Sequence, residues 1–137
     1  MPENFFFNCS IPVRISDINY GSHLGNDAFV SIIHESRMLW LKQYGFTELN
    51  IEGTVGFIMA DLAVEFKAES FYGDVIEIKI GVAEISRVSF ELYYGLSVNR
   101  ADQAILLANA KTGMVCYDYD QKKVAAIPSR ILQALTI

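Results

Sequence analysis

Basic residues are scarce in this sequence, where 11 Lys and Arg stand against 16 Asp and Glu and give a net charge of −5. They form no cluster, and nucleic-acid binding needs concentrated positive charge. Long apolar runs are also missing, since no segment approaches the roughly 18 residues of a membrane-spanning helix. We therefore expect neither nucleic acid nor a membrane as a partner. A small anionic ligand stays open, because a few basic side chains and helix amides can bind one.

Cysteine is equally rare. Cys9 and Cys116 are the 2 cysteines, and their separation matches no metal or redox motif. We interpret them as free thiols of a reducing compartment, although a pairing across the sheet stays open. The first segment, MPENFFFNCS, contains Glu3 and no basic residue, unlike a secretion signal. These features predict a cytoplasmic protein.

What the sequence does contain is typical of a folded protein. Hydrophobic residues make up 52% of the chain and charged residues 20%, which is the balance of a globular domain rather than a disordered segment. At 137 residues, the chain is long enough for one hydrophobic core. We expect a single domain over residues 1–137.

Hydrophobic periodicity predicts strands, one long helix and a short tail helix. The helical pattern runs from Asn26 or Asp27 to Tyr44, Gly45 supplies the stop, and Pro128 begins the tail helix. Short connections join the last four strands, which predicts antiparallel hairpins and a four-strand meander. The segments with strand-like alternation are 5–16, 56–69, 74–85, 88–98 and 104–118.

The long helix is apolar around most of its circumference, so we expect it to be buried and a curved sheet to wrap around it. One polar stripe interrupts the apolar surface at spacings of three, four and seven residues. This stripe is either a solvated edge or a functional face. Its members are Asp27, Ser31, His34, Glu35 and Lys42.

A polar turn joins the first strand to this helix. Within eleven residues it contains Asp17, Asn19, His23, Asn26 and Asp27, and two glycines allow it to bend. The turn places carboxylate, amide and imidazole groups beside the free amides of a helix N-terminus. We expect the functional site here.

The turn carries a resemblance to a known family. The motif RISDINYGSHLGND (14–27), followed by HESR (34–37) in the helix, resembles the hot-dog-fold acyl-CoA thioesterases and, within them, the 4-hydroxybenzoyl-CoA thioesterase-like branch. YGD (72–74) resembles a second feature of these proteins. Thr112 and Gly113 in the last strand, with Ile127 and Pro128 beyond it, resemble a third. The resemblance covers nearly the whole chain.

The resemblance implies an α+β protein of the hot-dog fold, with a curved antiparallel five-stranded sheet wrapped around a long central helix. It also implies a homodimer or homotetramer with active sites at the subunit interface. The implied reaction is hydrolysis of an acyl-CoA or acyl-carrier thioester without metal or cofactor.

One residue departs from the family pattern. Asn19 stands where these enzymes carry their usual catalytic aspartate, and an amide is neither a base nor a good nucleophile at neutral pH. Asn19 would then position water or the substrate carbonyl. The base would come from His23 in the turn or from the His34 and Glu35 pair in the helix.

Asp17 is a third candidate for the base, although it also suits a structural role as the partner of Arg14. Loss of the usual acid at position 19 also suggests an alternative function, an acyl-thioester binding protein that does not hydrolyse its ligand.

Substrate binding is expected at the start of the helix. The amides of Asn26 and Asp27, after the flexible Gly25, would stabilise the charge that develops on the thioester carbonyl oxygen. Asp61, an acid within an apolar strand, is either an interface contact or a second active-site carboxylate that a partner chain supplies.

Overall fold

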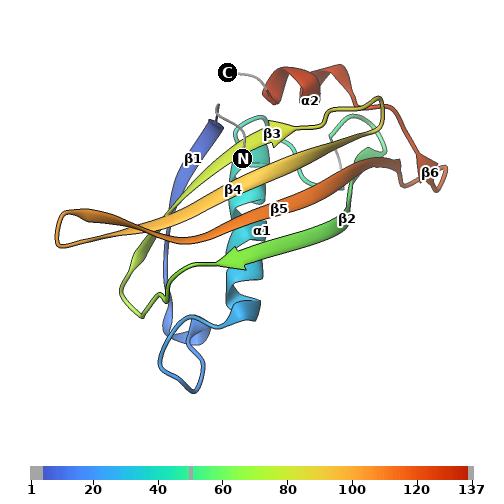
Figure 1. Ribbon diagram of the computed structural model, residues 1–137. Helices are drawn as coiled ribbons and strands as arrows, with labels where there is room; N and C mark the ends of the chain where they lie inside the picture. Colours follow the sequence, from blue (N-terminus) through green and yellow to red (C-terminus); the bar gives the residue numbers. More distant parts are fainter. Residues whose placement is uncertain (1–4, 50, 136–137) are drawn as a thin grey trace.

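The computed structural model describes residues 5–49 and 51–135 (Figure 1). Residues 1–4, including the Glu3 used above, lie outside this part. The elements in chain order are β1 (Phe5–Pro12), the 3-10 turn η1 (Ile15–Asp17), α1 (Asn26–Lys42), β2 (Val55–Phe66), β3 (Val75–Ala83), β4 (Ser89–Arg100), β5 (Gln103–Asp118), β6 (Lys123–Val124) and α2 (Ser129–Ala134).

All strands join one antiparallel sheet in the order β1-β3-β4-β5-β2, and the short β6 pairs with β5. The sheet is curved and α1 lies against one of its faces (Figure 1). The predicted architecture of a long helix and a curved antiparallel sheet is confirmed, and β6 adds a sixth strand to the five expected.

The predicted four-strand meander is wrong. β2 pairs with β5 at one edge of the sheet, whereas β3 pairs with β1 and β4 near the other edge. The connection between β2 and β3 is longer than the sequence suggested, because β2 ends at Phe66 and β3 begins at Val75. That connection, residues 67–74, passes the N-terminal end of α1, so it brings new residues to the turn.

The inward faces of β3 and β4 follow the predicted alternation, and they supply most of the core. β2 differs, because a bulge between Met59 and Asp61 reverses its alternation. Phe57 before the bulge and Val64 after it both pack into the core. The buried inward residues of β3 and β4 are Ile76, Ile78, Ile80, Phe90, Leu92, Tyr94, Leu96 and Val98.

The first strand ends earlier than predicted. The predicted strand over 5–16 stops at Pro12, and Ile15, which belonged to that predicted strand, is 71% exposed. The chain turns here because the Asp17 carboxylate accepts a hydrogen bond from the Arg14 N–H (2.8 Å) and closes η1.

Helix α1 is buried on one side and exposed along the predicted polar stripe. It ends at Lys42, two residues before the predicted Tyr44. Gly45 supplies the expected stop, since it adopts a φ of +76° and the Phe46 N–H donates to the Leu41 carbonyl (3.0 Å) in a Schellman motif. The exposed stripe consists of Asp27, Ser31, His34, Glu35 and Lys42. None of the described helices is long and apolar enough to cross a membrane.

Both cysteines are free, as predicted. Burial, with smaller contributions from Glu77 and Glu35, raises the pKa of the Cys9 thiol to about 11. Burial raises the pKa of Cys116 to about 12. Both thiols are therefore protonated at neutral pH and poorly nucleophilic.

Candidate active site

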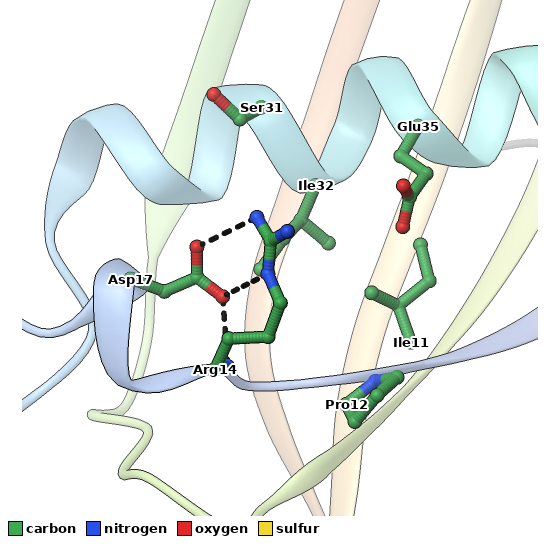
Figure 2. A pocket seen from close by; sticks show the side chains of 7 residues that line it. All are labelled: Ile11, Pro12, Arg14, Asp17, Ser31, Ile32 and Glu35. Atoms are coloured by element: carbon green, nitrogen blue, oxygen red, sulfur yellow. Dashed lines mark hydrogen bonds and ion pairs between the residues drawn. The ribbon is translucent and has the colours of Figure 1, made fainter.

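The turn between β1 and α1 is fixed at its base by Asp17. The buried carboxylate accepts hydrogen bonds from the Arg14 backbone and from its guanidinium Nη2 (3.3 Å), as Figure 2 shows. The carbonyl of the same residue accepts the Gly25 N–H (3.1 Å). The contacts of Asp17 are those of a residue that stabilises the turn. Its partner is Arg14, which the sequence analysis had offered for this structural role.

Asn19 shapes the tip of the turn. Its side-chain Oδ1 accepts the Gly21 N–H (2.9 Å), and its backbone N–H donates to the His23 carbonyl (3.0 Å). A Cβ added to Gly25 would lie 3.7 Å from the Asn19 Cβ. Asn19 therefore lies directly beside the first residues of α1.

The N-terminus of α1 has open hydrogen-bond donors. Gly25 caps the helix without a side-chain hydrogen bond, and the first N–H to reach the cap carbonyl belongs to Phe29 (3.1 Å). The amides of Asn26, Asp27 and Ala28 make no hydrogen bond to any residue that the structure describes. Together with the helix dipole, these donors favour a negatively charged oxygen.

Two clefts flank this helix end. The turn cleft has a volume of about 400 Å³ and brings together the predicted site residues Asp17, Asn19 and Asp27. Its other lining residues are Ser16, Ile18 and Tyr20. The histidine cleft, about 310 Å³, is lined by His23, Leu24, Asn26, Phe29, Phe66, Lys67, Ala68 and Glu69.

The histidine cleft combines an imidazole, a carboxylate and an apolar wall. Nε2 of His23 lies 3.8 Å from Oε1 of Glu69. The rings of Phe29 and Phe66 pack edge to face with centroids 5.2 Å apart. A histidine beside a carboxylate has the composition of a general base with its orienting partner.

Glu35 lies in a third space, between β1 and α1 (Figure 2). This strand cleft of about 180 Å³ also contains Asp17 and Ser31. Glu35 follows Asp27 by eight residues, which corresponds to about 12 Å along a helix. Its carboxylate is therefore too distant to act on a carbonyl held at the N-terminus of its own helix.

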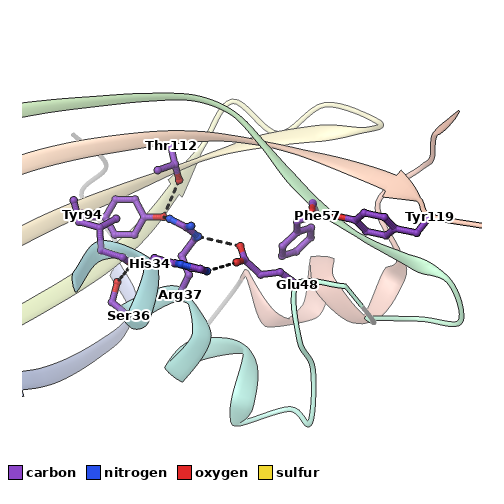
Figure 3. A network of polar contacts seen from close by, with 9 residues as sticks. His34, Ser36, Arg37, Glu48, Phe57, Tyr94, Thr112 and Tyr119 are labelled. Atoms are coloured by element: carbon purple, nitrogen blue, oxygen red, sulfur yellow. Dashed lines mark hydrogen bonds and ion pairs between the residues drawn. The ribbon is translucent and has the colours of Figure 1, made fainter. Parts of the chain in front are cut away.

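His34 is held away from the turn by a polar network (Figure 3). Its Nε2 lies 2.7 Å from Oε1 of Glu48, and Oε2 of Glu48 accepts Nε of Arg37 (3.1 Å). Arg37 also donates to the Tyr94 hydroxyl (3.3 Å), which lies 2.7 Å from the Thr112 hydroxyl. Within this network Arg37 pairs with Glu48.

Burial disfavours the charge on Arg37, but the Tyr94 hydroxyl and the Glu48 carboxylate outweigh this effect and hold the pKa of Arg37 above its ordinary value. Burial raises the pKa of Tyr94, although the Arg37 charge and the Thr112 hydrogen bond oppose that rise. The network is therefore a charged structural cluster.

Asp61 lies away from the turn. Its carboxylate accepts the Gly113 N–H (3.0 Å) across the bulge in β2 and lies 3.6 Å from Nζ of Lys111. Thr112, between these two partners, points into the core, so Asp61 belongs to the outer face of the sheet. Within one chain, the structure does not bring Asp61 to the other predicted site residues.

The sequence analysis missed Glu69 and Glu48. In the structure both residues lie in connections between secondary-structure elements, whereas the sequence pattern had placed Glu69 at the end of the strand expected over 56–69. Only the fold reveals the pairs that they make with His23 and His34. The one available signal was YGD (72–74), which falls in the same connection as Glu69. Among the described residues, no group of three side chains has the composition of a metal site.

Comparison with known proteins identifies the family and the fold. Residues 13–135 match the model of the thioesterase-like superfamily. A protein of Aquifex aeolicus, named as a candidate esterase, is 29% identical over 102 residues, which cover 74% of this chain and 75% of that protein.

The fold also matches solved structures. A 1,4-dihydroxy-2-naphthoyl-CoA thioesterase from Synechocystis superposes with a TM-score of 0.83 at 24% identity, over 94% of each chain. A 4-hydroxybenzoyl-CoA thioesterase, solved as an Asp-to-Asn mutant with 4-hydroxybenzoyl-CoA, gives a TM-score of 0.83 at 16% identity, over 95% of this chain and 98% of that one. The chain therefore belongs to the thioesterase-like superfamily, and it is a thioesterase of the hot-dog fold.

Proposed function

We propose that the protein hydrolyses acyl-CoA thioesters at the histidine cleft. The observation that carries the proposal is that Asn26, whose amide is open, lines the same cleft as the His23 and Glu69 pair, while the open amide of Asp27 follows it in the first turn of α1. The amides can stabilise an oxyanion, and the imidazole can accept a proton. Thioester hydrolysis needs both functions at one carbonyl carbon.

The proposed reaction has two steps. The thioester carbonyl oxygen accepts hydrogen bonds from the two amides while His23 removes a proton from water, and the hydroxyl adds to the carbonyl carbon. The tetrahedral intermediate then breaks its carbon–sulfur bond, the acid leaves, and the imidazolium returns the proton to the thiolate. Glu69 orients the imidazole and stabilises its charged form.

Other residues of the cleft suit the remainder of an acyl-CoA. Phe29 and Phe66 form an apolar wall for the acyl group. Lys67 also lines this cleft, and its positive charge suits the negatively charged phosphates of CoA. The two neighbouring structures named above act on CoA thioesters according to their names, which supports CoA over an acyl carrier.

A second candidate function is binding without hydrolysis. Asn19 motivates it, because the residue offers no base and its Oδ1 is already occupied by the Gly21 N–H. The neighbouring 4-hydroxybenzoyl-CoA thioesterase was solved with its CoA thioester as an Asp-to-Asn mutant, so an asparagine substitution in that protein is compatible with a bound thioester.

We also propose that the functional unit is a homodimer or a pair of dimers. β2 is a long edge strand with a free side, and it exposes Ile58 and Met59. Long apolar edge strands favour pairing with another chain. A cytoplasmic location suits the free thiols of Cys9 and Cys116.

The test is turnover on a panel of acyl-CoAs and matching acyl-carrier proteins, with a thiol-reactive dye as the readout. We expect the native protein to release CoA, and we expect Asn19→Asp to change the rate by less than about tenfold, since His23 supplies the base. Hydrolysis by Asn19→Asp alone would establish the binding protein instead. Absence of turnover by both folded proteins would overturn the proposed hydrolase.

A further inference from the structure

The YGD segment (72–74) is a motif of the sequence that the proposed reaction does not use. It forms a type II turn in which the Asp74 N–H donates to the Phe71 carbonyl (3.1 Å) and Gly73 adopts a φ of +95°. A side chain at position 73 would be strained in this left-handed conformation. The turn closes the connection between β2 and β3, and this connection also carries Glu69.

A single oxygen of Asp74 holds this connection together. Oδ2 accepts hydrogen bonds from the Ser70 hydroxyl (2.8 Å), the Phe71 N–H (2.9 Å) and Nη2 of Arg100 (2.5 Å). The same Nη2 donates to the Glu69 carbonyl (3.0 Å). Arg100 ends β4, so the ion pair attaches the connection to a rigid hairpin.

The electrostatics favour a charged pair. Burial alone would raise the pKa of Asp74, but the hydrogen bonds from Arg100, Phe71 and Ser70 outweigh it and hold the pKa below its ordinary value. The side chains of Asp74 and Arg100 are 17% and 30% exposed. The pair therefore stays ionised at neutral pH, in surroundings where its attraction is only partly screened.

The Asp74 and Arg100 pair fixes the backbone of Glu69 and Ser70, and both of these residues contact the segment that carries His23. Glu69, whose carbonyl Arg100 holds, presents its carboxylate to His23. The carbonyl of the buried Ser70 accepts the Leu24 N–H (2.7 Å), and Leu24 immediately follows His23. Both members of the His23 and Glu69 pair thus depend on one anchored segment.

We propose that Arg100 and Asp74 are positioning residues for the reaction, which act through the backbone of Glu69 and Ser70. This inference rests on the proposed function. Neither side chain lines the histidine cleft, so neither contacts substrate there. Their effect is to keep the Glu69 carboxylate within reach of the imidazole, and displacements near 1 Å are enough to slow catalysis.

The test compares Arg100→Gln, Arg100→Lys and Asp74→Asn with native protein in the acyl-CoA assay. We expect Arg100→Gln to lower kcat about tenfold and to change KM less than about twofold, because the apolar wall stays in place. Arg100→Lys retains the charge and should restore part of kcat. Arg130→Gln is the matched control, since Arg130 also lies over an aromatic ring but far from the turn.

A double-mutant cycle with Glu69→Gln identifies the route of the effect. If Arg100 acts through Glu69, Arg100→Gln should slow the Glu69→Gln enzyme less than about twofold. A full tenfold loss in that background would overturn the route through the Glu69 carboxylate. A larger effect on KM than on kcat in Arg100→Gln and Asp74→Asn would also contradict positioning.

A second readout does not need turnover. The chain has 2 histidines, so the ring NMR signals of His23 can be followed with those of His34 as an internal reference. We expect Arg100→Gln and Asp74→Asn to move the His23 signals and leave those of His34 unchanged. Unmoved His23 signals would overturn the inference even if the enzyme is active. Moved signals in a protein without turnover would support the anchoring and refute only the proposed function.

Discussion

Two histidine–glutamate pairs lie along helix α1, and they differ in almost every respect. His23 and Glu69 approach to 3.8 Å at the helix N-terminus, beside open amides and two clefts. His34 and Glu48 approach to 2.7 Å two turns further on. Glu48 there also holds the buried Arg37.

The difference separates a site from a structural network. In the second pair each charged group is engaged by neighbours, so little remains for a substrate to bind. In the first pair the Glu69 carboxylate is 63% exposed and lies 3.8 Å from the imidazole, and the adjacent backbone donors are open. A substrate can therefore reach these groups. Residue types alone do not distinguish the pairs, since both contain histidine and glutamate.

The largest effect should follow from breaking the closed network. Arg37→Met removes a buried charge and the hydrogen bonds that it donates to Glu48 and to the Tyr94 hydroxyl, which keep His34 and Thr112 as partners. We expect this change to cost about 3 kcal/mol of unfolding free energy. Chemical denaturation measures the loss, and Arg130→Met serves as the exposed control. A loss below about 1 kcal/mol would show that the network does not stabilise the fold.

The next largest effect should be the difference in kcat between variants of the two histidines. We expect His23→Gln to lower kcat about a hundredfold, because it removes the proposed base. His34→Gln keeps a hydrogen-bonding group beside Glu48 and should lower kcat less than about threefold. Steady-state kinetics with one acyl-CoA decides the comparison, and the reverse ranking would transfer the base to the helix pair.

A smaller effect should appear in the acid stability of the protein, through Asp74 in the connection that passes the N-terminal end of α1. Because the folded protein holds the pKa of Asp74 below its ordinary value, this carboxylate stabilises the fold above pH about 4. The stabilisation is lost as pH falls through the lowered pKa. Below pH about 4, the unfolding free energy of Asp74→Asn should therefore fall less steeply with pH than that of the native protein. We expect the two losses to differ by less than about 1 kcal/mol. An unchanged slope in thermal unfolding would contradict the pairing.

The smallest expected effect is the reaction of the protein's own thiols with the dye. It decides whether the thiol-reactive dye can be used to measure CoA release by the native protein and its variants. The raised pKa values of Cys9, about 11, and Cys116, about 12, keep both thiols protonated at pH 7. Folded protein without substrate should therefore react with the dye far more slowly than in denaturant. Rapid labelling of the folded protein would disprove this protection and require Cys→Ser variants for the assay.

Much of the fold was predictable because local patterns determine it. The apolar helix, its Gly45 stop and the alternation of β3 and β4 follow from periodicity and backbone preferences, and the structure confirms them. The position of β2 was not predictable. Strand pairing depends on which edges meet in space, and β2 meets β5 because its connection to β3 is long enough to cross the end of α1.

By itself, the sequence determined the chemical groups at the turn, since the residues from Asp17 to Asp27 are neighbours along the chain. Only the tertiary structure decided which of them have partners. Glu69 reaches His23 although the two residues are far apart in the sequence, whereas His34 of the helix pairs with Glu48, which lies in the connection after α1. Local preferences act over a few residues, whereas the placement of a carboxylate beside an imidazole depends on the packing of the whole sheet.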